Sequence, residues 1–293
     1  MIANLYICNR SFNWNGKDSL IDFKTKMYKF QKMIEKVSEH KEDNMIFVFK
    51  EGLMTTTILP GVDFVKLLSD REFAIENIGH ECYVILMGML KHCKETKAKL
   101  HDIKEYMTIE DSDNCHGVIV FSPIKNLDGK YQVISTVEGW FRFRRYYLGK
   151  FPKDTHFFLE ECKKYFPALM IHSSNNSTLR WYLNSHPQVI VRYLSSLNDH
   201  FSKEFLDSGY DLVNFLPLFA AKYDIEEASL EGNKDDKFYF QFDDELNKLA
   251  YCEAHLKMYH DDNGNDNQHC RIYFCKPQHQ EKFLYVGHIG DHL

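Results

Sequence analysis

Two groups of residues in this 293-residue chain carry side chains suited to chemistry on phosphates. The first lies near the C-terminal end, where six of the fifteen histidines fall between positions 255 and 292. A histidine titrates near neutral pH, so it can exchange a proton during phosphodiester cleavage while an arginine stabilises the developing charge. We expect Arg271, His288 and His292 to form such a catalytic set, because antiparallel pairing of the last two predicted strands would bring Arg271 near His288.

The second group is the segment 138–150, in which basic residues alternate with aromatic ones. Guanidinium groups bind phosphates and aromatic rings stack on bases, so this mixture is typical of nucleic-acid binding. The predicted nucleic-acid ligands are Arg142, Arg144, Arg145 and Lys150. The same pattern also fits a helix whose aromatic rings pack into the core while its arginines pair with acids such as Glu160 and Glu161.

Histidine and cysteine also coincide at several positions, which raises the question of a metal site. One set could converge on a zinc ion across a small sheet: Cys252, His255, Cys270 and Cys275. Their spacing does not form the paired C-x-x-C framework of a typical zinc site. We therefore predict no metal and no other cofactor.

A further short pattern lies on a predicted helix. Arg180, five residues and then His186 resemble the active motif of HEPN ribonucleases. Pro187 follows directly, and the residue before a proline is disfavoured in a helix, which indicates that the helix ends here. Fingerprints of other large enzyme classes are absent from the sequence, among them the phosphate-binding glycine loop and the nucleophile elbow.

The hydrophobic periodicity of the first third predicts alternating strands and helices. Residues 4–8 and 45–50 are expected as buried strands, and between them apolar residues recur at helical steps from Leu20 to Val37. Asp18 and Ser19 provide an N-cap for this helix. Another helix is predicted over 79–100.

The middle of the chain begins after a polar break at 110–114. Two strand-like runs, 117–121 and 131–136, flank an Asp-Gly turn, which is a good hairpin signal. Helices then dominate as far as about residue 223, with one predicted strand over 168–172.

After a second polar break at 226–236 the apolar period changes to two, which predicts a small antiparallel sheet. Its last two runs, 271–274 and 283–286, are followed by the sequence Gly-His-Ile-Gly-Asp-His-Leu. This pattern resembles the last two strands of RelE-type mRNA-cutting toxins. The resemblance implies a catalytic histidine or tyrosine at the end of the final strand and a basic residue on the strand before it. The matching positions are Arg271 and either His288 or His292.

Composition limits the cellular setting. The formal charge of −6 and the pI of about 6.2 argue against a surface that is basic throughout. No signal-peptide pattern is visible and the apolar run at 83–90 is too short for a membrane span, so we expect a cytoplasmic protein without a membrane partner. In that compartment the eight cysteines are expected as buried thiols.

These observations predict an α+β fold with three regions. They are a mixed N-terminal region over 1–112, a hairpin plus helix-rich middle region over 113–230, and a small antiparallel β domain over 231–293. The predicted function is action on RNA or DNA in a bacterial stress or phage-defence system, as a metal-independent ribonuclease. The alternative is a non-catalytic subunit that binds a protein partner in a defence or toxin–antitoxin assembly. Residues 234–293 favour the alternative, because seven Lys and Arg against eleven Asp and Glu give a net charge of −4.

Overall fold

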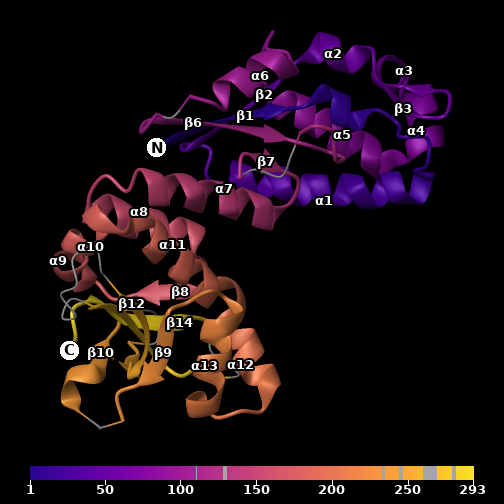
Figure 1. Cartoon of the computed structure of the whole chain (residues 1–293). Helices are drawn as coiled ribbons and strands as arrows, with labels where there is room; N and C mark the ends of the chain where they lie inside the picture. The colour runs from indigo at the N-terminus through magenta and orange to yellow at the C-terminus, as the bar shows by residue number, and fades with distance from the viewer. Residues whose placement is uncertain (110, 128–130, 233–234, 244–246, 260–268, 279–281) are drawn as a thin grey trace. The chain divides into compact units, whose positions relative to one another are not determined.

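The computed structural model describes residues 1–109, 111–127, 131–232, 235–243, 247–259, 269–278 and 282–293. They form two compact units, residues 1–144 and 145–293, each with its own five-stranded sheet (Figure 1). The boundary between the units falls inside helix α7 (Val137–Lys150). The fold is mixed α/β with a helical middle, as predicted at this coarse level.

The N-terminal unit is built on a parallel sheet with the strand order β5-β2-β1-β6-β7. Its strands are β1 (Ile2–Ile7), β2 (Asn44–Val48), β5 (Lys94–Glu95), β6 (Asn114–Ile119) and β7 (Val133–Ile134). Every pairing within it is parallel. β1 and β6 form the centre and are buried over most of their length, as expected for strands covered on both faces.

Helix α1 (Leu20–Ser38) begins where the sequence predicted. The Ser19 hydroxyl accepts a hydrogen bond from the Asp22 amide, and the Asp22 carboxylate accepts one from the Ser19 amide, which completes a capping box. Its apolar stripe is buried, from Phe23 to Val37. The other helices before the boundary are α2 (Lys50–Met54), α3 (Phe64–Ser69), α4 (Arg71–Ile78), α5 (His80–His92) and α6 (Leu100–Tyr106), with a short hairpin of β3 (Thr57–Leu59) and β4 (Val62–Asp63).

Two local predictions for this region are wrong. The helix expected over 79–100 ends at His92, because Cys93 is extended and Lys94–Glu95 pairs with β2 as an edge strand. The hairpin expected at 117–136 is instead a parallel pair of β6 and β7. Ile124 and Leu127 pack onto the hydrophobic cluster around Tyr6 and Val118, so the segment between the strands is a packed crossover and not a tight turn. Most of the predicted turn, residues 128–130, lies outside the described residues.

The C-terminal unit is built on a sheet with the strand order β8-β14-β13-β12-β9. Its strands are β8 (Leu169–Ile171), β9 (Glu227–Leu230), β12 (Ala254–Tyr259), β13 (His269–Phe274) and β14 (Leu284–Gly290). The pairs among β9, β12, β13 and β14 are antiparallel, but β8 runs parallel to β14. The prediction of a purely antiparallel sheet is therefore wrong. The period-two pattern shows only the strands of one region, whereas β8 comes from the helical middle of the chain.

Helices of this unit precede and follow β8. They are α8 (Thr155–Tyr165), α9 (Asn175–Thr178), α10 (Arg180–Ser185), α11 (Pro187–Ser196), α12 (Ser202–Ser208) and α13 (Leu212–Lys222), with a π-helical stretch over Leu197–Phe201. A small hairpin of β10 (Tyr239–Gln241) and β11 (Leu249–Tyr251) lies between β9 and β12 in the chain. α10 ends at Ser185, ahead of His186 and Pro187, as the proline predicted.

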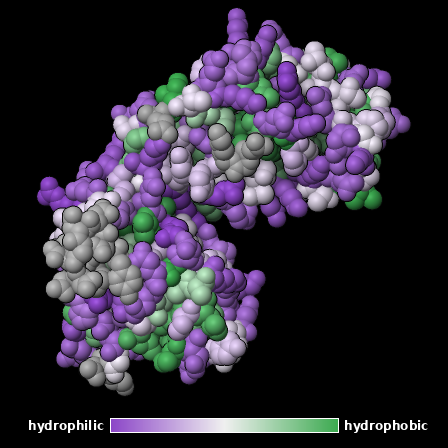
Figure 2. Space-filling view, in the orientation of Figure 1, coloured by the Kyte–Doolittle hydropathy of each residue, from purple (hydrophilic) through white to green (hydrophobic). Residues whose placement is uncertain are grey.

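Hydrophobic side chains fill the interior of both units, and the visible surface is largely hydrophilic with scattered apolar groups (Figure 2). All eight cysteines are buried free thiols, which confirms the prediction. None of the helices in the described part of the chain combines the length and apolar character needed to span a bilayer.

Strand β14 is buried at each of its seven positions, and a polar side chain from α9 fixes one end of it. Asn175 is fully buried, its amide nitrogen donates to the Gly287 carbonyl at 3.1 Å, and its amide oxygen accepts from the Ile289 backbone N–H. Thr178 adds a hydrogen bond from its hydroxyl to the Ile289 carbonyl at 2.9 Å. These contacts satisfy backbone groups on the side of β14 where β8 has already ended.

We expect Asn175→Ala to lower the free energy of unfolding by about 2 kcal/mol or more, because it leaves buried Gly287 and Ile289 backbone groups without partners. The neighbouring exposed Asn176 makes a matched control, and Asn176→Ala should change that free energy by less than about 0.5 kcal/mol. Urea denaturation followed by circular dichroism measures both. Equal stability of the two variants would show that Asn175 does not fix β14.

Candidate functional site

A row of polar side chains crosses the C-terminal sheet. Ser229, His255, Tyr273 and His288 stand directly opposite one another on β9, β12, β13 and β14. Residues opposite one another in an antiparallel ladder share a face of the sheet. On each strand the adjacent residue points to the other face of the sheet. These four residues form an apolar row: Ala228, Leu256, Ile272 and Ile289. The sequence alternation therefore places the chemistry-bearing side chains on one face and the core on the other.

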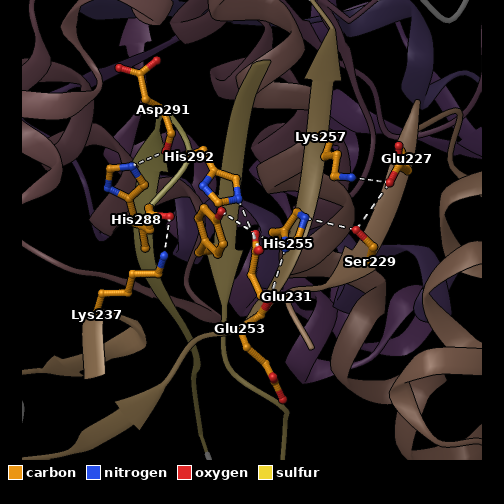
Figure 3. Close-up of polar contacts among 12 residues, drawn as sticks. Glu227, Ser229, Glu231, Lys237, Glu253, His255, Lys257, His288, Asp291 and His292 are labelled. Carbon is orange, nitrogen blue, oxygen red and sulfur yellow. Dashed lines mark hydrogen bonds and ion pairs between the residues drawn. The ribbon is translucent and has the colours of Figure 1, made fainter. Parts of the chain in front are cut away.

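Glu231, which directly follows β9, is the centre of the polar face (Figure 3). Its carboxylate accepts a hydrogen bond from the Tyr273 hydroxyl at 2.7 Å. Nε2 of His292 lies 3.2 Å from the other carboxylate oxygen, and Nδ1 of His255 lies 3.5 Å from the first. Burial acts to raise the pKa of Glu231, but the Tyr273 hydroxyl and nearby positive charge outweigh it and hold that pKa below its usual value. Glu231 is therefore ionised at neutral pH.

His255 belongs to the interior of this network. Its Nε2 lies 3.1 Å from the Ser229 hydroxyl and its Nδ1 lies 3.2 Å from the Glu253 carbonyl. Burial lowers the pKa of His255, so the ring is neutral at physiological pH. With both nitrogens engaged and the side chain almost fully buried, His255 supports the site but does not face solvent.

His288 is also buried, and its Nε2 lies 2.9 Å from the Asp291 carbonyl oxygen. A carbonyl can only accept, so Nε2 carries the proton and Nδ1 is the basic nitrogen of the neutral ring. Burial lowers the pKa of His288, which keeps it neutral. The Asp291 carboxylate accepts a hydrogen bond from the Tyr182 hydroxyl, so the segment after β14 is fixed to α10 as well as to His288.

A pocket of about 580 Å³ opens beside this segment. Arg180, Trp181 and Asn184 of α10 line one side, and His288, Asp291 and His292 line the other. Arg180 and Trp181 are exposed, Trp181 by 52%, and the His292 side chain is exposed by 47%. The pocket thus presents a cation, an aromatic face and an imidazole held by a carboxylate.

The structure brings two of the three predicted catalytic residues into this pocket. His288 and His292 line it, whereas Arg271 does not. Arg271 is half-buried on β13 opposite Gly290, on the same face as His288 and near enough to Glu231 to help lower its pKa. Antiparallel pairing of the last two strands is confirmed.

Sequence reasoning missed Glu231 and the part played by α10. Glu231 falls in the 226–236 segment, which was expected to be a polar break. The signal that could have found it is the alternation of Glu227, Ala228, Ser229 and Leu230 immediately before it, a period-two pattern. Of the HEPN-like pair, Arg180 lines the pocket and His186 does not.

The predicted nucleic-acid ligands of α7 have a different arrangement from the one expected. Arg144 is fully buried and donates to the Met1 carbonyl at 3.0 Å and the Asp43 carbonyl at 3.4 Å. Arg145 is buried as well, donates to the Tyr165 carbonyl and forms an ion pair of 2.7 Å with Asp199. Arg142 is exposed and Lys150 is half-buried. The two central guanidinium groups therefore serve internal packing, and the acid in their ion pair above is Asp199, where the alternative interpretation named Glu160 and Glu161 as examples.

The histidine and cysteine residues weighed for zinc are split between the two faces of the sheet. His255 lies in the polar row, whereas Cys270 stands opposite Met258 on the apolar side. Over the ranges that the structure describes, no three His, Cys, Asp or Glu side chains are grouped so as to hold a metal ion.

Comparison with known proteins adds no family. The chain matches no protein-family model, and no curated protein or solved structure is significantly similar to it. The resemblance to RelE-type toxins therefore depends on the residues of the last two strands alone.

Replacing Arg144 tests whether this side chain stabilises the fold, as its buried position indicates, or serves to bind a ligand. Arg144→Ala should lower the free energy of unfolding by about 3 kcal/mol, because it removes charged hydrogen bonds to buried carbonyls and leaves a cavity. Arg142→Ala, on the exposed side of the same helix, should change it by less than about 0.5 kcal/mol. Urea unfolding of both variants tests this. A fully stable Arg144→Ala protein would contradict the packing role.

The buried histidines predict a pH dependence of stability. In the unfolded chain His255 and His288 bind a proton below their ordinary pKa of about 6.5, whereas burial keeps them neutral to lower pH in the fold. The unfolded state therefore binds more protons in that window, and the free energy of unfolding should fall as pH drops below about 6.5. The lowered pKa of Glu231 also contributes to the free energy of unfolding, and this contribution is lost only at more acidic pH.

Chemical denaturation at pH 7.5 and 5.5 measures this effect. The fall in unfolding free energy between the two pH values should be smaller in His288→Gln than in the original protein. His156→Gln, at an exposed position of α8, is the matched control and should leave the fall unchanged. An identical fall in all three proteins would mean that His288 does not titrate with unfolding.

Proposed function

We propose that the protein cleaves RNA without a metal ion, at the pocket between α10 and the segment after β14, as part of a bacterial stress or phage-defence response. One observation carries the proposal: His292 is held by an ionised carboxylate, Glu231, at the rim of a pocket that also presents Arg180 and Trp181. A pocket of about 580 Å³ is within the size range of small-ligand sites, and a nucleotide is a ligand of that scale.

His292 is the proposed general base. When its Nε2–H donates to Glu231, the carboxylate fixes the tautomer and leaves Nδ1 as the proton acceptor. Nδ1 takes the proton of a ribose 2′-hydroxyl, the 2′ oxygen attacks the adjacent phosphorus, and the bond to the 5′ oxygen breaks. The departing oxygen takes a proton from water. Because the nucleophile is a 2′-hydroxyl, this chemistry selects RNA over DNA.

The other side chains have supporting roles in this proposal. Arg180 stabilises the negative charge that grows on the phosphate oxygens. Trp181 offers an exposed ring on which a base of single-stranded RNA stacks. His288 is neutral and buried and positions the backbone of Asp291, and Arg271 acts through Glu231 by keeping it ionised. His288 and Arg271 are thus positioning residues here, in contrast to the catalytic roles predicted from the sequence.

We expect the purified protein to cut total cellular RNA but not plasmid DNA, with and without EDTA. His292→Ala should lower the cleavage rate by a factor of about 100 or more, the usual contribution of a general base. Glu231→Gln should lower the cleavage rate less, because the imidazole of His292 stays in place but loses the carboxylate that orients it. Trp181→Ala should mainly raise KM, since it removes stacking and leaves the proton transfer intact.

His156→Ala, at an exposed position of α8 away from the pocket lining, is the matched control and should cut RNA at the original rate. Cleavage that persists in His292→Ala would refute the assignment of the base. If the original protein cuts neither free RNA nor mRNA on translating ribosomes, the alternative of a non-catalytic subunit is favoured. A pull-down of protein partners then tests that alternative.

A further inference from the structure

A second pocket, of about 440 Å³, lies in the N-terminal unit and shares no residue with the proposed RNA site. It is formed by the segments that follow three neighbouring parallel strands. Asn9 and Arg10 come after β1, Phe49 and Gly52 come after β2, and the residues from Lys99 to Lys104 come after β5. The pocket therefore lies at the carboxyl edge of the sheet.

The topology of the sheet favours this edge for ligand binding. In the order β5-β2-β1-β6-β7, strands β2 and β5 lie on one side of β1 and strands β6 and β7 lie on the other. The connections thus diverge at β1. In open parallel sheets, ligands bind outside the carboxyl ends of the strands, and the reversal point here lies between β1 and β6. The pocket is lined by residues that follow β1, β2 and β5 and by none that follow β6, so it lies at this carboxyl edge beside the reversal point. The segment that leaves β1 carries Asn9 and Arg10 into the pocket.

The lining is positively charged. Arg10, Lys99 and Lys104 all line the pocket and are exposed, and no Asp or Glu is among the residues that line it. Lys104 donates to the Asn126 carbonyl at 3.2 Å, which leaves its positive charge uncompensated by that contact. Among residues the structure describes, no carboxylate forms an ion pair with Arg10 or Lys99. This concentration of cations is notable in a chain of net charge −6.

The floor of the pocket is fixed in advance. The Asn9 side-chain amide donates to the Gly52 carbonyl at 3.0 Å and so joins the segment after β1 to helix α2. Gly52 permits this approach, because a Cβ there would lie 2.5 Å from the Phe49 ring and 2.7 Å from the Asn9 amide nitrogen. The Phe49 ring adds an apolar wall to the same pocket.

We propose that this pocket binds a small phosphate ester of about the size of a mononucleotide. Arg10, Lys99 and Lys104 bind the phosphate, and the base or sugar packs against Phe49. Guanidinium and ammonium groups bind phosphate by charge-assisted hydrogen bonds. The neighbouring carboxylate of Asp102 does not line the pocket, because it accepts from the Lys99 backbone N–H at 2.7 Å and lies 3.1 Å from Nε2 of His101. The concave shape and the volume fit one nucleotide better than a strand of nucleic acid.

Isothermal titration calorimetry of the full chain with inorganic phosphate, AMP, GMP and adenosine tests the proposal. We expect at least one of the two nucleotides to bind, with at least tenfold higher affinity than adenosine. Arg10→Ala and Lys99→Ala should each weaken that binding by about tenfold or more, through the loss of a charge-assisted hydrogen bond. Arg10→Lys should keep part of the affinity, and melting temperatures check that each variant is folded.

Two controls make the outcome specific. Lys91→Ala removes an exposed lysine of α5 that does not line the pocket, and should bind as the original protein does. Adenosine is the second control, because it offers the base and sugar without the phosphate. No binding of phosphate, AMP or GMP at millimolar concentration, equal affinity for adenosine, or unchanged binding by a folded Arg10→Ala would each overturn the proposal. Displacement of AMP by an RNA oligonucleotide with higher affinity would overturn the small-molecule assignment.

Discussion

The candidate site depends on one partly buried carboxylate with several partners. Glu231 accepts a hydrogen bond from Tyr273 and lies beside His255 and His292, so three separate segments of the C-terminal unit meet at its two oxygens. An ionised carboxylate beneath a protein surface is costly unless nearby donors and positive charge stabilise it. The polar face of the sheet supplies both, and this requirement explains why tyrosine, histidine and arginine share that face. Removing any one partner changes the electrostatic balance for the others, because the network is shared.

The sheet that holds this network also restricts what its histidines can do. His255 has neighbours on both sides along the cross-strand row, whereas His288 stands at the end of the row beside Tyr273. Burial lowers the pKa of both and keeps them neutral. His292 lies beyond the end of β14, and its side chain is exposed to solvent. A histidine that is both oriented by a carboxylate and accessible to substrate is found just past the end of β14. Of the three positions, His292 satisfies both conditions.

The sequence predicted the elements whose signals are local. Helix α1 and strands β1, β2, β13 and β14 follow directly from apolar periodicity, and the Ser19 cap from its neighbours. Pairings between distant segments were missed, because a strand pattern shows which residues face the core but not which strand lies beside it. The parallel pairing of β8 with β14 is of this kind, whereas β6 and β7 were expected to pair but in the antiparallel direction.

The candidate site shows the same division. His288 and His292 could be predicted from residue type and from their place near the end of the last strand. Arg180 belongs to the HEPN-like pair, and Glu231 falls in a predicted polar break. Neither could be placed beside the histidines, because Arg180 comes from α10 and Glu231 follows β9, and both join them through tertiary structure. The basic segment of α7 shows the converse error, since Arg144 and Arg145 have a suggestive composition but their guanidinium groups bind backbone carbonyls in the interior. Residue type alone does not distinguish an arginine that binds phosphate from one that completes a core.

The overall acidity of the chain gives a reason for placing cations in pockets. The long-range electrostatic interaction between a protein of formal charge −6 and a phosphate-bearing ligand is repulsive on average. Attraction must then come from short-range interactions between charges, which salt screens less when the charges lie in a concave, partly desolvated site. Each of the two pockets places positive charge in a concavity whose lining excludes part of the solvent. One holds Arg180 beside Trp181, and the other holds Arg10, Lys99 and Lys104. In such a protein, selectivity for a ligand depends on fit within the pocket and not on the general attraction of a basic surface.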